Sequence, residues 1–139
     1  VMVLFGPFQK DSHPSADAVL CAFAMFDRLE RLNAKWKAQG LPTFRIGIGI
    51  HAGDAIFGNM SSGRRKTLTA IGDAVNLASR IESTTKEFGV PLLVSEVVQK
   101  EVASALTGRV AFTDLGPVKV KGRSEAVRLF AGETVKPSS

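Results

Sequence analysis

The stretch RRKTLTAIGDAVNLASRIE, residues 64–82, limits the fold of this chain more than any other. It predicts a short strand over Lys66–Ile71, a turn at Gly72, and a helix that begins near Asp73 and closes at Gly89. At about 100° per residue, this helix has two different sides. The apolar side holds Ala74, Leu77, Ala78, Ile81, Thr85 and Phe88, and the polar side holds Asp73, Asn76, Arg80, Ser83 and Glu87.

Asn76 and Arg80 lie four positions apart on the polar side of this helix. Side chains at that spacing sit one turn above each other, so an amide and a guanidinium can converge on one ligand. An exposed helix tolerates such a pair anywhere, and its meaning therefore depends on the sequence around it.

The rest of the chain predicts an α+β domain. A long amphipathic helix is expected from Pro14 to about Gln39, and a short helix, capped by Ser95, to about Ala105. The further expected strands are Val1–Phe5, Phe44–His51, Ala55–Met60, Val90–Val94, Val110–Leu115, Val118–Val120 and Val127–Ala131. The continuous apolar run Val1–Phe5 is expected to be buried on both faces, and Phe44–His51 is expected to pair with Ala55–Met60 as a hairpin. This order favours a mostly antiparallel sheet with helices packed on one face.

Glycines alternate with isoleucines in the predicted strand Phe44–His51. Gly47 and Gly49 leave one face of the strand nearly flat, which lets another backbone or a ligand approach closely. Gly47-x-Gly49-x-x-Ala52 also matches a dinucleotide-binding fingerprint formally. That motif must open a helix after a strand, whereas these glycines lie inside the strand, so the match is excluded.

Length and composition suit one domain. The chain has 139 residues, of which 45% are apolar, and its single cysteine, Cys21, cannot form an internal disulfide, which fits a reducing cytosol. No apolar run approaches the roughly 20 residues that span a bilayer, and no secretory signal opens the chain. We expect a cytoplasmic segment without direct membrane contact, including the case of a cytosolic domain in a membrane-anchored parent. Because the chain opens on Val1 instead of Met, we interpret it as a fragment.

The net charge of +5 admits several polyanionic partners. Basic residues cluster at Arg64–Lys66 and at Lys119–Arg123; nucleotide phosphates could use such clusters, and a solvated surface could hold them equally well. A nucleic-acid module is disfavoured, because the strands lack the paired aromatic residues of an RNA-recognition sheet. His13 and His51 have no companion histidines for a metal site and are interpreted as incidental or structural.

Three blocks of the chain resemble one known family. TAIGDAVNLASRIE is similar to the signature of the class III nucleotide cyclases, the adenylate and guanylate cyclase catalytic domains. RIGIGIHAGDAIFGNMSSGRRK resembles the family's strand, hairpin and loop, and LGPVKVKGRSEAVRLFAGE resembles its closing hairpin. The resemblance implies a ferredoxin-like α+β catalytic domain over residues 1–133 that lacks its first strand and its metal-binding aspartates. A disordered tail is expected over residues 134–139.

The resemblance implies an enzyme, an adenylate cyclase that converts ATP to 3′,5′-cyclic AMP and pyrophosphate. The 3′-hydroxyl attacks the α-phosphorus in line, so negative charge builds on the phosphoryl oxygens. By position in the motif, Asn76 resembles the residue that orients the ribose, and Arg80 resembles the catalytic residue that stabilises the pentavalent phosphate. An arginine suits that role because its planar fork can bond two phosphoryl oxygens at once.

Three further residues resemble the family's substrate-binding positions. Thr69 falls where the family carries its base-recognising residue, and a threonine hydroxyl there favours ATP. Lys121 matches the lysine that holds the β- and γ-phosphates, and Arg65 is expected to assist with phosphates. Guanylate cyclases usually carry a cysteine or similar small residue at the position of Thr69, and guanylate cyclase stays open as an alternative.

The family uses two metal ions, Mg²⁺ or Mn²⁺, whose two aspartates would both precede Val1, as would the adenine-contacting lysine. Asp54 is interpreted as a turn residue, Asp73 as a helix N-terminal residue and Asp114 as a hairpin residue, so no metal ligand is assigned. The family's sites form between two catalytic domains, which implies a homodimer or a second cyclase domain as partner. A catalytically inactive cyclase-like domain that dimerises and regulates is the other alternative.

Overall fold

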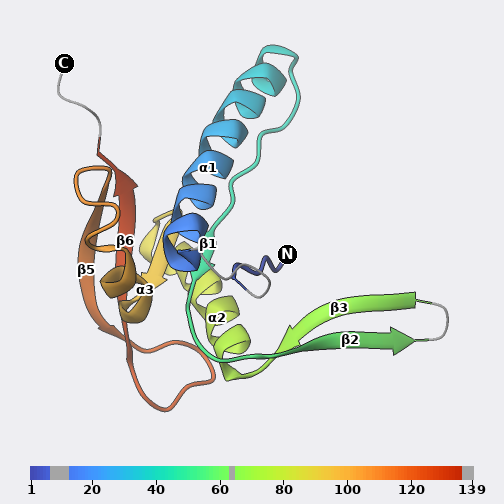
Figure 1. Ribbon diagram of the computed structural model, residues 1–139. Helices are drawn as coiled ribbons and strands as arrows, with labels where there is room; N and C mark the ends of the chain where they lie inside the picture. The colour runs from blue at the N-terminus through green and yellow to red at the C-terminus, as the bar shows by residue number, and fades with distance from the viewer. Residues whose placement is uncertain (7–12, 63–64, 136–139) are drawn as a thin grey trace.

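A computed structural model describes residues 1–6, 13–62 and 65–135 of the chain (Figure 1). Its elements in chain order are α1 (Pro14–Ala38), β1 (Ile48–Ile50), β2 (Ile56–Ser62), β3 (Arg65–Ile71), α2 (Asp73–Phe88), β4 (Leu92–Ser95), α3 (Glu96–Val102), β5 (Val110–Val118) and β6 (Val127–Thr134). The predicted α+β class is confirmed, and both long helices lie where their apolar periodicity placed them.

Four strands form the main sheet in the order β1-β4-β6-β5. β1 runs parallel to β4, and the other two pairs are antiparallel, so the sheet is mostly antiparallel as predicted. β2 and β3 form a separate antiparallel hairpin that projects from the body of the molecule (Figure 1). The predicted hairpin between Phe44–His51 and Ala55–Met60 is therefore wrong. β1 instead takes a parallel partner that lies far along the chain, and such a pairing leaves no local turn signal in the sequence.

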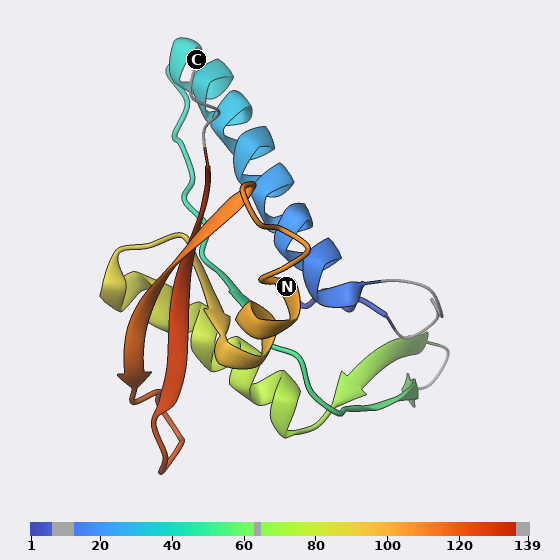
Figure 2. The same cartoon turned by 60° about the vertical axis from the view of Figure 1, so that its left-hand side comes forward.

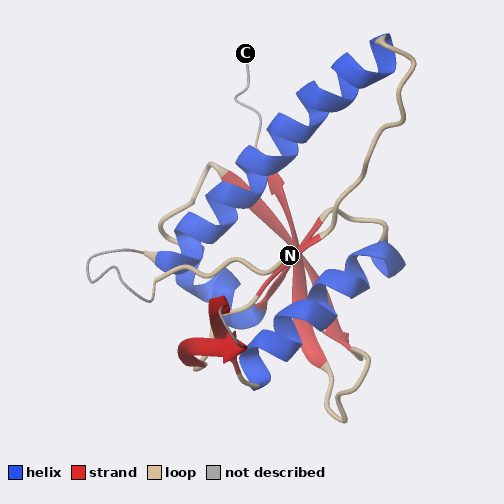
Figure 3. Ribbon diagram, turned by 90° about the vertical axis from the view of Figure 1, so that its right-hand side faces the viewer, coloured by secondary structure: helices blue, strands red, loops and turns tan. Residues whose placement is uncertain are grey.

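Helices cover both faces of the main sheet. Leu92 and Val94 of β4 pack with residues of α1 and α3, whereas Leu93 packs with Leu77 and Ile81 of α2. Because successive strand residues point to opposite faces, α1 and α3 lie on one face and α2 lies on the other. Figure 3 shows the sheet between α1 and α2. The prediction of helices on one face is wrong, and the apolar character of every residue from Leu92 to Val94 is what a strand covered on both faces requires.

β1 is shorter than the predicted strand Phe44–His51. The side chain of Asn33 on α1 donates from Nδ2 to the Phe44 carbonyl oxygen at 2.7 Å and accepts from the Phe44 amide at 2.9 Å. These two bonds hold the segment before β1 alongside the outer half of α1 (Figure 2), where the Phe44 ring also packs edge-on against Trp36. The backbone of Phe44 is therefore occupied by a side chain and does not join the sheet.

Gly47 and Gly49 allow α2 to approach β1 closely. A β-carbon on Gly49 would lie 2.8 Å from the carbonyl oxygen of Ala78 and from Cα of Glu82. A β-carbon on Gly47 would lie 3.1 Å from Cβ of Thr85 and closer still to its hydroxyl. The expectation that these glycines admit another backbone is confirmed, and that backbone belongs to α2.

The N-terminal run Val1–Phe5 is not a strand in the structure. Its side chains are exposed, each to at least 37%. Apolar content alone does not make a strand, because a buried backbone needs hydrogen-bonding partners, and among the described strands none pairs with this run.

The last strand runs further than predicted. β6 continues through Thr134, and the Val135 amide donates to the Arg109 carbonyl oxygen at 3.0 Å. The expected tail therefore cannot begin at Thr134, while residues 136–139 of that tail lie outside the described residues. Among the helices described, none combines the length and the apolar character that crossing a membrane requires.

Candidate active site

The polar side of α2 presents three side chains to solvent along one stripe. Asp73, Asn76 and Arg80 are all exposed, and their spacing of three and four residues places them within one narrow arc of the helix. Leu77 and Ile81, on the adjoining apolar side of the helix, are buried against the sheet. The burial of this helix thus fixes the direction in which the three residues point. We call Asp73, Asn76 and Arg80 the polar stripe.

A tight turn between β5 and β6 lies beside this stripe. The Arg123 amide donates to the Val120 carbonyl oxygen at 3.2 Å, which closes a four-residue turn. Gly122 has a φ of +82°, as the third residue of a type II turn requires. Val120 is buried in the same apolar cluster as Leu77, whereas Lys121 is exposed. We call Lys121–Arg123 the basic turn.

The polar stripe and the basic turn meet at two points. A β-carbon on Gly122 would lie 3.7 Å from Nε and 3.9 Å from Nη2 of Arg80, so the Arg80 guanidinium lies against the backbone of the turn. Nη1 of Arg123 donates to both carboxylate oxygens of Asp73, at 2.7 and 2.8 Å. The fold therefore brings Arg80 close to Gly122, which directly follows Lys121, although Arg80 and Gly122 are far apart in sequence.

The segment that follows β1 lies against the start of α2, since a β-carbon on Gly53 would lie 3.0 Å from Cβ of Ala74, and against the end of β4. His51 Nδ1 and the Ser95 hydroxyl share a hydrogen bond of 2.8 Å. Burial lowers the pKa of His51 below its ordinary value of 6.5, and the nearby Arg123 guanidinium lowers it further, while Asp73 and Glu101 oppose that shift. Ser95 occupies the N-cap position of α3 as predicted, but its side chain makes no cap hydrogen bond. Its hydroxyl is bonded to His51 instead.

Thr69 and Arg65 both lie on β3, for which the structure describes the backbone. Thr69 stands opposite Gly58, three residues before Gly72, and Arg65 stands opposite Ser62 at the far end of the hairpin. At about 3.3 Å per residue, roughly 20 Å of strand separates Arg65 from Ile71, the last residue before the turn into α2. The backbone of Arg65 therefore stands at the far end of the hairpin from the start of α2.

The carboxylates that the structure describes do not fit a two-metal centre. Over residues 1–6, 13–62 and 65–135, no group of three His, Cys, Asp or Glu side chains could hold an ion. Asp73 is paired with Arg123, and Asp114 with Arg128, which lowers the pKa of Asp114. A carboxylate that is paired with an arginine is less available to coordinate a metal ion. Neither Asp73 nor Asp114 is therefore assigned as a metal ligand.

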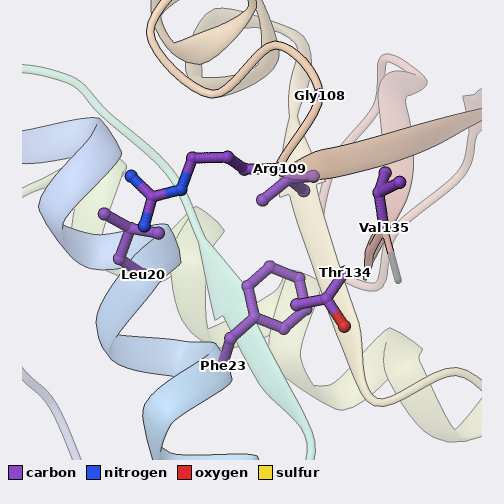
Figure 4. Close-up of a pocket in the computed structure, with 7 residues that line it drawn as sticks. Leu20, Phe23, Gly108, Arg109, Thr134 and Val135 are labelled. Atoms are coloured by element: carbon purple, nitrogen blue, oxygen red, sulfur yellow. The ribbon is translucent and has the colours of Figure 1, made fainter. Parts of the chain in front are cut away.

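Figure 4 shows a cavity of about 410 Å³ whose lining includes no residue of the polar stripe. Leu20 and Phe23 of α1 line one side of it. Val110 and Thr134, from the adjoining ends of β5 and β6, line it too, as does Arg109, which directly precedes β5. Because Leu20 and Phe23 pack on the face of the sheet that α1 covers, the cavity is on the opposite face from α2.

Sequence reasoning did not anticipate the partnership of Asp73 with Arg123. In the sequence, Asp73 has the pattern of a helix N-terminal residue and Arg123 belongs to a basic cluster, and neither pattern links the two residues. The only sequence signal was their opposite charge, because no periodicity relates residues this far apart.

A sequence model described as the adenylate and guanylate cyclase catalytic domain matches residues 1–131. The chain belongs to this family. The resemblance carried by residues 64–82 and by the blocks on either side is therefore confirmed. The family covers adenylate and guanylate cyclases alike, so membership alone does not choose between ATP and GTP.

Individual cyclases resemble the chain in sequence and in structure. Adenylate cyclase 1 of Rhizobium meliloti (strain 1021) is 39% identical over 120 residues, which cover 86% of this chain and 17% of that protein. The crystal structure of the adenylyl cyclase CyaB from P. aeruginosa has a TM-score of 0.81 at 27% identity, covering 96% of this chain and 66% of that one. The guanylyl cyclase Cya2 has a TM-score of 0.78 at 26% identity, covering 96% and 65%. The chain thus spans only part of each protein that it resembles.

Proposed function

We propose that this chain is the catalytic domain of an adenylate cyclase, which converts ATP to 3′,5′-cyclic AMP and pyrophosphate. The observation that supports this most is the meeting of the polar stripe with the basic turn. Arg80 lies against Gly122, the residue that directly follows Lys121. Cationic residues from distant parts of the sequence are thereby gathered at one exposed surface. Such a surface suits a polyanionic triphosphate whose charge grows during the reaction.

Arg80 and Asn76 are the proposed catalytic residues. The ribose 3′-hydroxyl attacks the α-phosphorus while the bond to pyrophosphate breaks, so charge develops on the phosphoryl oxygens. The planar guanidinium of Arg80 can donate two hydrogen bonds to those oxygens, and the Asn76 amide, one turn earlier, orients the ribose. Among the described residues Arg80 forms no ion pair, so its charge is not already neutralised by a carboxylate of the described chain.

The remaining substrate contacts are proposed from the basic turn and from β3. Lys121 holds the β- and γ-phosphates as a point charge, and the Thr69 hydroxyl contacts the adenine base. Arg65 assists with phosphates. Because roughly 20 Å of strand separates Arg65 from the start of α2, we expect Arg65 to serve a site completed by a second copy.

We propose that the active site is shared between two copies of the chain, or with a second cyclase domain. The polar stripe is open to solvent, which leaves room for a facing subunit. The described residues supply the part of the site that contacts the phosphates and the ribose. We assign them no metal ligand and derive no step through an ion, so Mg²⁺ or Mn²⁺ enters as a component of the assay.

Guanylate cyclase is the second candidate function. The likeness to the guanylyl cyclase Cya2, at a TM-score of 0.78, favours it as a specific alternative. Thr69 argues for ATP, because its hydroxyl can accept a hydrogen bond from the adenine amino group. Assays with both nucleotides separate the two candidates.

The test is to incubate the full-length protein with Mg²⁺ or Mn²⁺ and with ATP or GTP, and to identify the product by chromatography. We expect cyclic AMP from ATP at a higher kcat/KM than cyclic GMP from GTP. A preference for GTP would replace the proposal with a guanylate cyclase. If neither nucleotide is cyclised by the folded protein, the domain is a non-catalytic, dimerising member of the family.

Arg80→Ala tests the role of the polar stripe in the same assay. Removal of a donor to the transition state typically lowers kcat by about 10²–10³. Arg28→Ala is the matched control, because Arg28 is an exposed arginine on α1. We expect Arg28→Ala to keep full activity and both variants to keep the melting temperature of the parent protein.

A further inference from the structure

The ion pair between Asp73 and Arg123 joins two segments that the proposed site needs in register. Asp73 is the first residue of α2, and Arg123 is the last residue of the basic turn. Both carboxylate oxygens accept from Nη1 of Arg123, at 2.7 and 2.8 Å. Asp73 and Arg80 are seven residues apart, which is two helical turns or about 10 Å along one side of α2. The basic turn therefore lies alongside the polar stripe. It contacts Asp73 at one end of these two helical turns and Arg80 at the other.

The two sides of the turn are attached by different forces. Val120 is buried with Leu77 and Ile81, which fixes the start of the turn through apolar packing. Arg123 fixes its end through charge. Between these two attachments stand Lys121 and Gly122, and the lack of a side chain at Gly122 lets the turn rest on the Arg80 guanidinium.

The ion pair between Asp73 and Arg123 contributes little to the stability of the fold. The Asp73 side chain is 77% exposed and the Arg123 side chain 31% exposed, and ion pairs with such access to water typically contribute about 0–1 kcal/mol. Because this ion pair has short hydrogen bonds but contributes little to folding, we look for its role in the position of the basic turn.

We propose that Asp73 and Arg123 are positioning residues that hold the basic turn against Arg80 and so set the place of Lys121 relative to the catalytic arginine. This proposal rests on the function proposed above. With the pair intact, Lys121 is presented to the triphosphate in one arrangement. Without it, the turn keeps its attachment at Val120 and loses the other, so the lysine contact with the phosphates weakens while Arg80 remains on its helix.

The chain offers a matched control for this pair. Asp114 and Arg128 form a second bidentate Asp–Arg contact in the same β5–β6 hairpin, with Nε of Arg128 at 3.1 Å from each carboxylate oxygen. Both side chains are exposed to a similar or greater degree than Arg123. Neither residue belongs to the basic turn or to α2, so breaking this pair removes the same kind of interaction away from the proposed site.

The experiment measures KM and kcat for ATP in Asp73→Asn, Arg123→Gln, the charge-swapped double variant Asp73→Arg/Arg123→Asp, and the control Asp114→Asn. We expect each single variant to raise KM about tenfold, roughly the loss of one charge-assisted hydrogen bond, with a smaller change in kcat. The charge-swapped variant should recover part of the loss, and Asp114→Asn should leave KM unchanged. An unchanged KM in folded Arg123→Gln, or an equal rise in Asp114→Asn, overturns the proposal.

Amide hydrogen exchange of residues 121–124 separates this proposal from the function on which it rests, because it needs no turnover. We expect exchange in this segment to become faster in Arg123→Gln and to stay unchanged in Arg128→Gln. If the parent protein cyclises no nucleotide, the proposed function fails and the exchange result stands by itself. If exchange at the turn is the same in Arg123→Gln as in the parent protein, the positioning role is wrong whatever the activity.

Discussion

The two faces of the main sheet are built in different ways. On the face covered by α1 and α3, the contacts are apolar, and Val19, Leu92 and Val98 are fully buried. On the other face, α2 lies so close to the glycines of β1 that side chains are excluded from part of the contact, and its outer side carries the polar stripe. Both faces therefore hold an apolar cluster. The second face differs in its glycine contact, which holds α2 close to β1, and in the polar stripe that meets the basic turn.

The two helices also differ in how much of their length is buried. α1 is 25 residues long, and its buried residues all lie between Ser15 and Ala22. α2 has 16 residues and is buried at positions from Leu77 to Thr85. The outer half of α1 extends from the body (Figure 2), while α2 is held along its length. The catalytic role proposed for α2 requires a helix held in this way, because a shift of about 1 Å in a reacting group can lower the rate by a large factor.

The largest expected effect comes from breaking the close contact between α2 and β1. Gly49→Val places carbon atoms where the backbone of Ala78 and Glu82 already lies, so α2 must move outward. We expect the free energy of unfolding to fall by at least about 3 kcal/mol, measured by urea denaturation. Gly58→Ala is the control, because nothing lies within 4 Å of a β-carbon on Gly58, and its cost should stay below about 1 kcal/mol. Equal stability of Gly49→Val and Gly58→Ala would show that the contact is not tight.

Two neighbouring leucines sharpen the comparison of the faces. Leu92 and Leu93 are both fully buried, one against α1 and α3 and the other against α2. Replacing either by Ala should cost about 2–5 kcal/mol of stability in thermal or urea unfolding. Among molecules that remain folded, we expect Leu93→Ala to lower kcat/KM more than Leu92→Ala does. The same loss of activity in both variants would mean that the two faces do not divide their tasks.

Lys121 tests whether the basic turn contacts the phosphates. Lys121→Ala should raise KM for ATP about tenfold, since one charge-assisted contact is lost. Lys119→Ala is the control, because Lys119 is also exposed and lies two residues earlier, outside the basic turn. A KM that rises equally in both variants would indicate a general effect of positive charge and not a specific contact.

The smallest expected effect is a dependence of stability on pH at His51. The pKa of His51 is lowered in the folded protein, so the fold favours the neutral ring. The free energy of unfolding should therefore be highest above pH 6.5, the ordinary pKa, and should decrease as the pH falls through the interval between 6.5 and the lowered value. His51→Gln should flatten that part of the stability profile, measured by urea denaturation at several pH values. A profile unchanged by the substitution would assign the dependence to other groups.

The sequence was most informative where structure is local. The periodicity of Pro14–Ala38 and of Asp73–Phe88 predicted both long helices, and Gly40 and Gly89 adopt positive φ just after them, as expected for helix ends. The motif on α2 supplied the candidate residues Asn76 and Arg80, since residues three or four apart share a helix side in any fold.

The features that sequence reasoning missed all depend on pairing between distant segments. Phe44 left the expected strand because Asn33 takes up its backbone groups, and no rule of strand periodicity anticipates a bond from a helix side chain. The partner of β1 and the placement of α2 on its own face were set by packing across the whole sheet. The ion pair of Asp73 with Arg123 joins residues that only the folded hairpin brings together.

In the proposed reaction, the guanidinium of Arg80 acts on the phosphate during bond exchange. Arg80→Lys keeps the positive charge and the long side chain while removing the planar fork. The direct measurement is kcat for cyclic AMP formation by this variant of the full-length protein at saturating ATP, with the melting temperature recorded alongside. We predict a fall of about 100-fold or more with an unchanged melting temperature. A folded Arg80→Lys protein that keeps kcat within about threefold of the parent protein, a change too small for a lost transition-state donor, would contradict the account.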